Sequence, residues 1–285
     1  MNIPASARLW IVVALVAPCL AGAISPARAQ SGERPGTARQ QSRELHYDLI
    51  TSVAIIAASA GVIAAVRGFE LGPEECRWCE RSDLNRVDRW FRDSLADIDD
   101  TAMDVTGGVA TALIPLGAIG LDALAARRAV RGARAVGVDG LIMLESASVA
   151  LALTTAVKAA AGRQRPYTLD LPEYEVGGDA DQNASFFSGH TALGFSLAVS
   201  AGMTASLRGY RIAPAIWSTG LALATVAGFS RLAGDEHFFT DLVAGAAVGS
   251  AVGVLVPWQF HRPRQLSVSA TQIGGGRGLA VQGWF

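Results

Sequence analysis

Three polar clusters lie at the ends of long apolar segments, and each contains residue types suited to phosphate chemistry. They are KAAAGRQRP (158–166), SFFSGH (185–190) and SRLAGDEHFFTD (230–241). The first contains Lys158, the only lysine among 24 basic residues, together with Arg165, and the third contains Arg231. Three cations need an anionic partner, and phosphate suits them, because arginine binds its oxygens as a fork and lysine as a point charge.

Two of the four histidines, His190 and His237, also lie in these clusters. His237 and Asp241 are four residues apart and therefore share one face of a helix. An aspartate that accepts a hydrogen bond from one imidazole nitrogen leaves the other nitrogen free as a nucleophile. His190 can then act as general acid for the leaving oxygen and as base for water. Either histidine alone is compatible with a structural role, and the three clusters together predict a catalytic site.

The neighbours of the histidines carry further expectations. Ser188 and Gly189 precede an apolar segment, where backbone N–H groups at a helix N-terminus bind anions and glycine permits close approach. Asp235 and Glu236 directly precede His237. Because two acids beside the proposed nucleophile do not suit an anionic substrate, we expect them to face solvent.

The rest of the chain is rich in apolar residues. Hydrophobic residues make up 51% and charged residues 17% of the 285 residues, and the mean hydropathy is +0.31. A net charge of −1 and the lack of a basic patch with aromatics give no indication of nucleic-acid binding. The composition predicts an all-α, six-helix bundle that crosses the membrane, with a soluble helical domain as the alternative. The six apolar segments are 49–66, 105–126, 138–161, 191–207, 212–229 and 242–257.

Charge alternates between the connecting loops. Loops 127–137 and 208–211 contain arginines and no acid, as does the stretch directly after the last apolar segment. Acids lie in the other loops, 67–104, 162–190 and 230–241. If all six segments cross, the positive-inside rule places the arginine-rich loops in the cytoplasm and the three polar clusters outside.

The N-terminus has the pattern of a secretory signal over 1–29, with cleavage after Ala29, followed by a polar linker over 30–48. A first transmembrane anchor is the alternative. Six crossings place residue 48 in the cytoplasm, whereas a cleaved signal places it outside. Either residues 49–66 do not fully cross, or 1–29 are retained, or the domain is not an ordinary six-span protein.

Three smaller features complete the organisation. Cys76 and Cys79 form CRWC, for which we weigh a local disulfide in an oxidising compartment against a reactive dithiol. Segment 83–97 has the spacing of an amphipathic helix, at the membrane interface or on the domain surface. The helical domain covers 49–260, and the tail over 261–285 is expected to be a short β-hairpin appendage.

The motifs K-x6-RP, SGH and SR-x5-H-x3-D resemble the signature of the type 2 phosphatidic acid phosphatase superfamily. This superfamily includes lipid phosphatases, bacterial acid phosphatases and vanadium haloperoxidases. The resemblance spans Lys158 to Asp241 and implies a helical core and phosphoryl transfer through a phosphohistidine, without a metal or other cofactor.

The resemblance also implies a role for each matching residue. His237 would be the nucleophile, Asp241 its orienting partner and His190 the acid and base. The phosphate would be held by Lys158, Arg165, Ser188, Gly189 and Arg231. One departure is Phe187, which stands where the family usually has proline, and this change is expected to affect rate or substrate preference by loosening the loop.

These features predict a phosphatase of lipid phosphomonoesters or polyprenyl diphosphates, embedded in a bacterial inner membrane with its site on the periplasmic side. Its expected partners are the phosphorylated lipid and the membrane, and the oligomeric state is left open. A soluble periplasmic acid phosphatase is the main alternative. A vanadate-dependent haloperoxidase and a non-catalytic lipid-binding protein are further alternatives.

Overall fold

The described part of the chain consists of several segments. The computed structural model describes residues 43–69, 76–79, 84–95, 100–126, 132–172, 176 and 179–263, and the backbone of two C-terminal strands. The predicted signal peptide over 1–29 and most of the linker over 30–48 lie outside the described residues.

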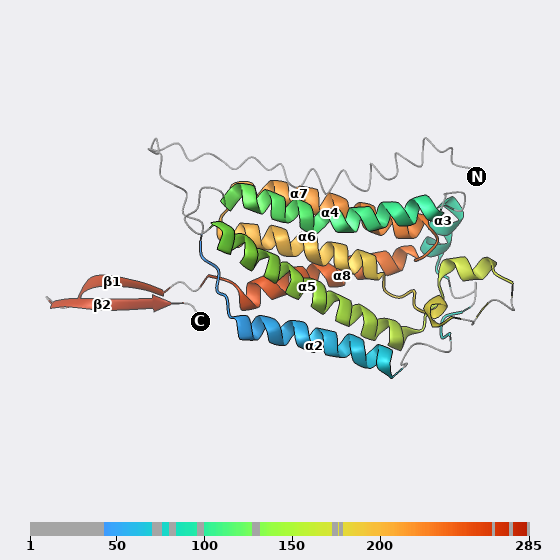
Figure 1. Cartoon of the computed structure of the whole chain (residues 1–285), viewed down its shortest axis with the longest axis horizontal. Coiled ribbons are helices and arrows are strands. Elements are labelled where there is room, and N and C mark those ends of the chain that lie inside the picture. Colours follow the sequence, from blue (N-terminus) through green and yellow to red (C-terminus); the bar gives the residue numbers. More distant parts are fainter. Residues whose placement is uncertain are drawn as a thin grey trace.

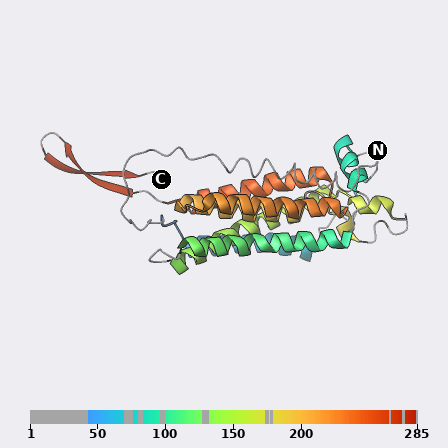
Figure 2. The same cartoon turned by 90° about the horizontal axis from the view of Figure 1, so that it is seen from above.

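Six long helices run along a common axis, and one short helix, α3, lies at one end (Figures 1 and 2). The helices are α2 (Leu49–Gly68), α3 (Arg86–Leu95), α4 (Asp100–Ala126), α5 (Gly132–Ala161), α6 (Gly189–Arg208), α7 (Ala213–Ala233) and α8 (Phe239–Phe260). Two 3₁₀ helices, η2 (Pro166–Asp170) and η4 (Ala180–Asn183), lie between α5 and α6. The described part therefore has seven α-helices rather than six, because the predicted amphipathic segment over 83–97 contributes α3.

Five helices are long and apolar enough to cross a membrane: α2, α4, α5, α7 and α8. Their number supports a membrane protein. The sixth long helix, α6, contains serines, threonines and glycines and does not meet this criterion. It packs against α4, α5, α7 and α8 and lies in the middle of the bundle (Figure 1). Since its neighbours surround it, α6 does not need an apolar surface that faces lipid.

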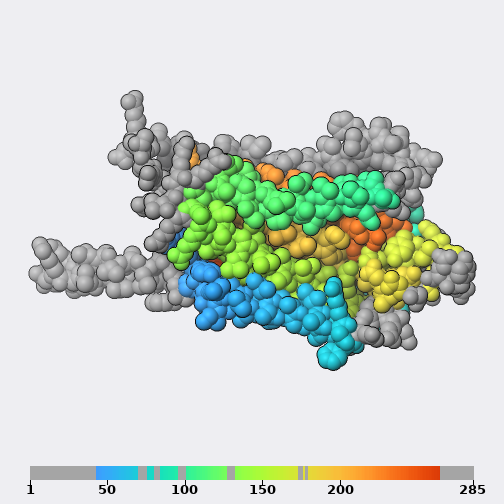
Figure 3. All heavy atoms as spheres, in the orientation of Figure 1, coloured from blue at the N-terminus to red at the C-terminus, as the bar shows by residue number. Residues whose placement is uncertain are grey.

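Helix α2 lies on the outside of the bundle against α5 (Figure 3). It exposes Leu49, Ile50, Val53 and Val62, which suits contact with lipid. Its N-terminal side is near the end of α8, because the backbone N–H of His46 donates to the carbonyl oxygen of His261 at 3.2 Å. Its C-terminal end reaches the opposite end of the bundle. The segment 49–66 is therefore part of a helix that is long and apolar enough to cross a membrane.

Small residues set the contact between α6 and α8. A Cβ atom added at Gly245 would lie 2.7 Å from the carbonyl oxygen of Ser188, and one at Gly253 would lie 2.8 Å from that of Ser196. A Cβ atom added at Gly249 would lie still closer to the backbone of Ala192. Only glycine permits this approach, so the stripe fixes how the two helices lie along one another.

Away from the polar clusters, the bundle contains a buried ion pair and a buried hydrogen bond between charged or titratable side chains. Arg208 Nε donates to the carboxylate of Asp139 at 2.6–2.7 Å, and His261 Nε2 and Glu145 Oε2 are hydrogen-bonded at 2.9 Å. These contacts tie α5 to the C-terminal ends of α6 and α8.

Two antiparallel strands, β1 (Leu266–Ile273) and β2 (Gly276–Gly283), follow the helices, with Leu266 opposite Gly283. Their side chains lie outside the described residues. The predicted appendage over 261–285 therefore stays a prediction.

Candidate active site

The site forms where four helix ends meet, with the segment between α5 and α6 beside them. The end of α5 supplies Lys158, the start of α6 follows Ser188, α7 ends after Arg231, and α8 begins after His237. The backbone N–H of Ser188 donates to the carbonyl oxygen of Asp241 at 3.1 Å, which joins the second cluster to the third. The structure thus brings the predicted site residues to one end of the bundle. They are Lys158, Arg165, Ser188, Gly189, His190, Arg231, His237 and Asp241.

The contact between His237 and Asp241 differs from the expected hydrogen bond. Nδ1 of His237 lies 3.8 Å from Oδ2 of Asp241, and among the described residues this nitrogen has no hydrogen-bond partner. Oδ2 instead accepts hydrogen bonds from Ser185 Oγ at 2.6 Å and from the backbone N–H of Phe238 at 3.0 Å. The second bond is a helix-capping contact, which holds the carboxylate towards the start of α8 and away from the imidazole.

Sequence reasoning missed the residues that hold Asp241. Arg163 donates to Oδ1 of Asp241 and, at 2.7 Å, to Oδ2 of Asp88 in α3. Asp88 also accepts from the backbone N–H of Thr240 at 2.9 Å and from its hydroxyl at 2.8 Å. One sequence signal could have revealed Asp88: it lies four residues after Leu84, on the apolar face of the predicted helix, where a carboxylate needs a cationic partner.

The two predicted phosphate-binding arginines already contact carboxylates. Nη1 of Arg165 contacts Oε2 of Glu236, and Nη2 of Arg231 lies 3.2 Å from the same oxygen. Asp235 lies 3.0 Å from Arg92 and has a positive φ of 49°, which aspartate tolerates in a tight turn. The expectation that both acids face solvent is therefore wrong, because both are half-buried and paired with arginines.

A pocket of about 460 Å³ opens beside the cations between α2, α5 and α6. Lys158 and His190 line it together with the apolar side chains of Val66, Leu151 and Leu193. His190 is exposed into this space, one residue after Gly189 at the start of α6. The arrangement joins a cationic, acid–base region to an apolar surface.

Both histidines are held in the neutral form. Complete burial lowers the pKa of His237 to about 3, and the charges of Lys158 and Arg165 act in the same direction. For His190, desolvation by the surrounding protein is the main cause that lowers the pKa to about 4. The positive charges nearby, above all that of Arg231, act in the same direction. A neutral imidazole has a free lone pair, so His237 is suited to nucleophilic attack.

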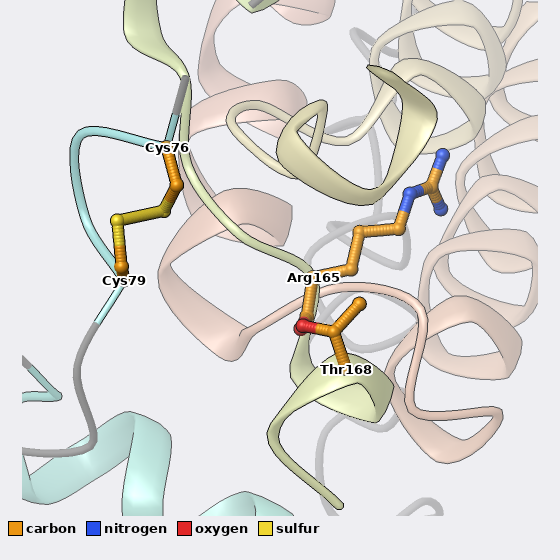
Figure 4. The surroundings of a disulfide bond; sticks show 4 residues. All are labelled: Cys76, Cys79, Arg165 and Thr168. Atoms are coloured by element: carbon orange, nitrogen blue, oxygen red, sulfur yellow. A yellow bond between two sulfur atoms is a disulfide. The ribbon is translucent and has the colours of Figure 1, made fainter. Parts of the chain in front are cut away.

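A disulfide loop packs against the segment that carries Arg165 (Figure 4). Cys76 and Cys79 are joined, with their Cα atoms 5.6 Å apart. The backbone N–H of Gln164 donates to the carbonyl oxygen of Trp78 at 3.3 Å, and the Arg163 guanidinium lies 5.6 Å from the Trp78 ring centre. The loop therefore supports the segment that contacts Asp241.

The loop with the unusual Phe187 is closely packed. Phe187 is buried, and its ring meets that of Phe186 edge to face at 6.0 Å. Ser188 caps α6 by accepting from the backbone N–H of Thr191 at 3.4 Å. The effect of Phe187 on rate or substrate preference stays a prediction.

A protein-family model and a solved structure are similar to this chain. Residues 139–265 match the family model of the PAP2 superfamily. The crystal structure of a transmembrane PAP2-type phosphatidylglycerolphosphate phosphatase from Bacillus subtilis is similar over 73% of this chain and 94% of that chain, at 18% sequence identity and a TM-score of 0.45. No curated protein matches the sequence.

The matched range contains every predicted site residue, from Lys158 to Asp241. The match supports a phosphoric ester hydrolase. It names the same superfamily that the three motifs resemble. Residues 139–265 of this chain are thus similar to the PAP2 superfamily.

Proposed function

We propose that this protein is a phosphatase that hydrolyses lipid phosphomonoesters or polyprenyl diphosphates through a phosphohistidine on His237. One observation carries the proposal: three cations and two histidines come together at one end of the bundle, where Lys158 and His190 line a pocket with apolar walls. The cations, Lys158, Arg165 and Arg231, suit a phosphate. The apolar wall suits the hydrocarbon part of a lipid.

In the first step His237 attacks phosphorus through Nε2, since Nδ1 faces Asp241. The P–N bond forms while the P–O bond to the lipid breaks, and the electron pair of that bond leaves with the lipid oxygen. His190 gives this oxygen a proton, so the lipid leaves as an alcohol or, from a diphosphate, as a monophosphate. Asp241 stabilises the positive charge on the phosphorylated imidazole, and the three cations stabilise the phosphoryl oxygens.

His190 must carry a proton in this step, although its pKa in the substrate-free protein is about 4. Desolvation lowers this pKa most, and the cations that add to the effect are those assigned to the phosphate. A bound dianion offsets their charge and raises the pKa of His190 towards its ordinary value. Substrate binding therefore favours the protonated form of His190, which the general acid requires.

In the second step water attacks the phosphohistidine. His190, now neutral, accepts a proton from the water as its oxygen bonds to phosphorus. The P–N bond breaks, its electron pair returns to His237, and inorganic phosphate leaves. Both histidines are then ready for another cycle.

The lipid class follows from the surroundings of the pocket. Val66 belongs to α2, whose outer surface is apolar, and Leu151 belongs to α5, which is also long enough to span a membrane. A lipid can therefore place its chain along these helices while its phosphate reaches Lys158. A soluble acid phosphatase has no need for five such helices.

We assign the site to the periplasmic side, because the arginine-rich loops join the opposite helix ends. The Cys76–Cys79 disulfide supports this side, since disulfides persist in oxidising compartments. An impermeant maleimide should label a cysteine placed at Asp179 in intact cells and leave one at Arg211 unlabelled. The reverse pattern would place the site in the cytoplasm.

The central test is phosphate release by the detergent-purified protein and its His237→Asn variant. The panel should include phosphatidic acid, phosphatidylglycerol phosphate, undecaprenyl diphosphate and a soluble monoester. We expect the variant to lose about 10³-fold or more in kcat, because no other side chain replaces the nucleophile. His46→Asn, at the far end of the bundle, is the matched control.

Two outcomes would contradict the proposal. Full activity of a folded His237→Asn variant would exclude the phosphohistidine. Turnover of the soluble monoester alone, with release of the protein into buffer without detergent, would favour the soluble alternative.

A further inference from the structure

We propose that Glu236 determines specificity by occupying the phosphate site of the substrate-free protein, from which an incoming phosphate must displace it. The inference rests on the proposed function, because it assigns Arg165 and Arg231 to the substrate phosphate. It adds that a carboxylate of the protein itself competes with the substrate phosphate for these arginines.

The contacts of Glu236 place its charge between the two arginines. Its Oε2 atom contacts Nη1 of Arg165 and lies 3.2 Å from Nη2 of Arg231. The side chains of these arginines are 7% and 11% exposed, so little water competes for them. One carboxylate oxygen thus bridges two guanidinium groups in the manner of a phosphate oxygen.

The bridge leaves one donor unused. Nε of Arg231 is buried and has no hydrogen-bond partner among the described residues. A buried donor without a partner is costly, and a phosphate has more acceptor oxygens than a carboxylate. A phosphate that replaces Glu236 can therefore satisfy the guanidinium more fully.

The backbone allows the side chain to leave without moving the nucleophile. The N–H groups of Glu236 and His237 both donate to the carbonyl oxygen of Arg231, at 3.1 and 3.2 Å. These bonds hold the main chain on both sides of the carboxylate. Rotation of the Glu236 side chain, which is 23% exposed, is therefore enough to open the site.

Other acids near the arginines have different positions. Asp181 lies 2.8 Å from Arg165, and Asp104 lies 2.5 Å from Arg231. Each contacts one arginine, and their side chains are 61% and 50% exposed. Within the described part of the chain, the bridging position belongs to Glu236.

A resident carboxylate favours substrates with two negative charges. A phosphomonoester dianion has one charge more than Glu236, whereas a phosphodiester has the same single charge. Ordinary membrane phospholipids with a diester head group therefore gain no electrostatic advantage in displacing it. Glu236 would keep the site free of these abundant lipids and admit monoesters and diphosphates.

The test compares anion binding by wild type, Glu236→Gln and Glu236→Ala in detergent. Inorganic phosphate is the first probe, and phosphatidylglycerol in mixed micelles, as a competitive inhibitor, is the second. When a competing state is removed, the apparent Kd falls by the fraction of protein that state had occupied. We expect both variants to bind inorganic phosphate roughly 3- to 10-fold more tightly, and phosphatidylglycerol to inhibit them more strongly than wild type.

Asp235→Asn is the matched control, because it removes the same charge one residue earlier, from a side chain that pairs with Arg92. Asparagine also tolerates the positive φ at this position. We expect this variant to bind inorganic phosphate within about twofold of wild type, because Asp235 pairs with Arg92 rather than occupying the bridging position, and a partly exposed ion pair contributes little.

Unchanged or weaker phosphate binding in both folded Glu236 variants would overturn the inference, since weaker binding means that Glu236 only holds the arginines in place. Equal gains in Asp235→Asn would also overturn it, because the effect would then be one of general charge. Failure of the proposed function would be seen in a different measurement. If that function is wrong, the wild-type protein releases no phosphate from any substrate, and the comparison of phosphate binding still decides the role of Glu236.

Discussion

Nδ1 of His237 faces Oδ2 of Asp241 at 3.8 Å, and the carboxylate is held by Ser185, Phe238 and Arg163. Asp241 is therefore fixed before it interacts with the imidazole. In the proposed mechanism its negative charge lies beside the nitrogen that keeps its proton while the opposite nitrogen attacks phosphorus. The contacts that hold Asp241 would then help to align the proposed nucleophile.

Asp88 is expected to act on turnover through Arg163, which it holds at 2.7 Å. Asp88→Asn keeps the size of the side chain and removes a buried charge, so Arg163 loses a partner. Breaking a buried ion pair costs about 3–5 kcal/mol of stability, and we expect kcat to fall roughly tenfold as Asp241 shifts. KM should change little, since Asp88 is not assigned to the phosphate.

Steady-state kinetics of Asp88→Asn and of Asp93→Asn, an exposed position in the same helix, would check this. A variant with lower stability and an unchanged kcat would reduce Asp88 to a structural role.

The burial of His237 should make stability depend on pH. Its pKa is about 3 in the folded protein and about 6.5 when unfolded, so the unfolded state binds more protons between these values. The stability is complete above about pH 7 and decreases as pH falls below 6.5, by up to about 1.4 kcal/mol per pH unit.

Chemical unfolding in detergent at pH 7.5 and 5.0 would measure this effect. Wild type should lose about 2 kcal/mol more than His237→Asn between these two values. Equal losses would show that the imidazole is accessible to protons in the folded protein.

The pocket should discriminate by chain length. Leu151 lines it and is 38% exposed, so Leu151→Trp can fill the space without disturbing the core. We expect KM for a long-chain lipid phosphate to rise about fivefold or more, which is about 1 kcal/mol. KM for a short soluble monoester should stay within about twofold.

Leu153→Trp is the control, because Leu153 is similarly exposed on α5 and is not among the residues that line the pocket. Equal effects of the two variants on the lipid would place the chain elsewhere.

The disulfide loop should matter for both stability and rate. A closed loop of four residues stabilises by about 2 kcal/mol in the chain-entropy model. Cys76→Ser should lose this contribution and loosen Trp78 from Arg163, with a fall in kcat of roughly two- to fivefold.

Reductant should reproduce the change in wild type and leave the Cys76→Ser/Cys79→Ser double variant unaffected. If reduced and oxidised wild type unfold and react alike, the loop does not support the site.

The sequence motifs correctly predicted that the three polar clusters lie together. They are at the ends of apolar segments, which are easy to recognise in a sequence. Lys158 closes one such segment, Ser188 and Gly189 open the next, and Arg231 and His237 flank a short turn. Helices packed side by side bring such ends together. Five of the six predicted apolar segments accordingly fall within one of the long helices, and the segment 212–229 begins one residue before α7.

The supporting contacts could not be predicted in the same way. Asp88 and Arg163 are 75 residues apart, and Trp78 meets Arg163 through an irregular loop. No periodic pattern connects such positions, since the pairing depends on how loops fold over the helix ends. The position of Glu236 depends likewise on a turn with a positive φ at Asp235, which directs the next side chain inwards.

The glycines of α8 bear on the chemistry although they carry no functional group. Gly245 lies against the carbonyl oxygen of Ser188, and Gly253 repeats this contact two turns further along. A methyl group at Gly253, about 18 Å from Asp241 along the helix, would push α8 away from α6. The gap between His190 and His237 would then widen while every polar side chain kept its identity. The packing of the apolar interior thus sets the distance between the two histidines, on which the proposed phosphoryl transfer depends.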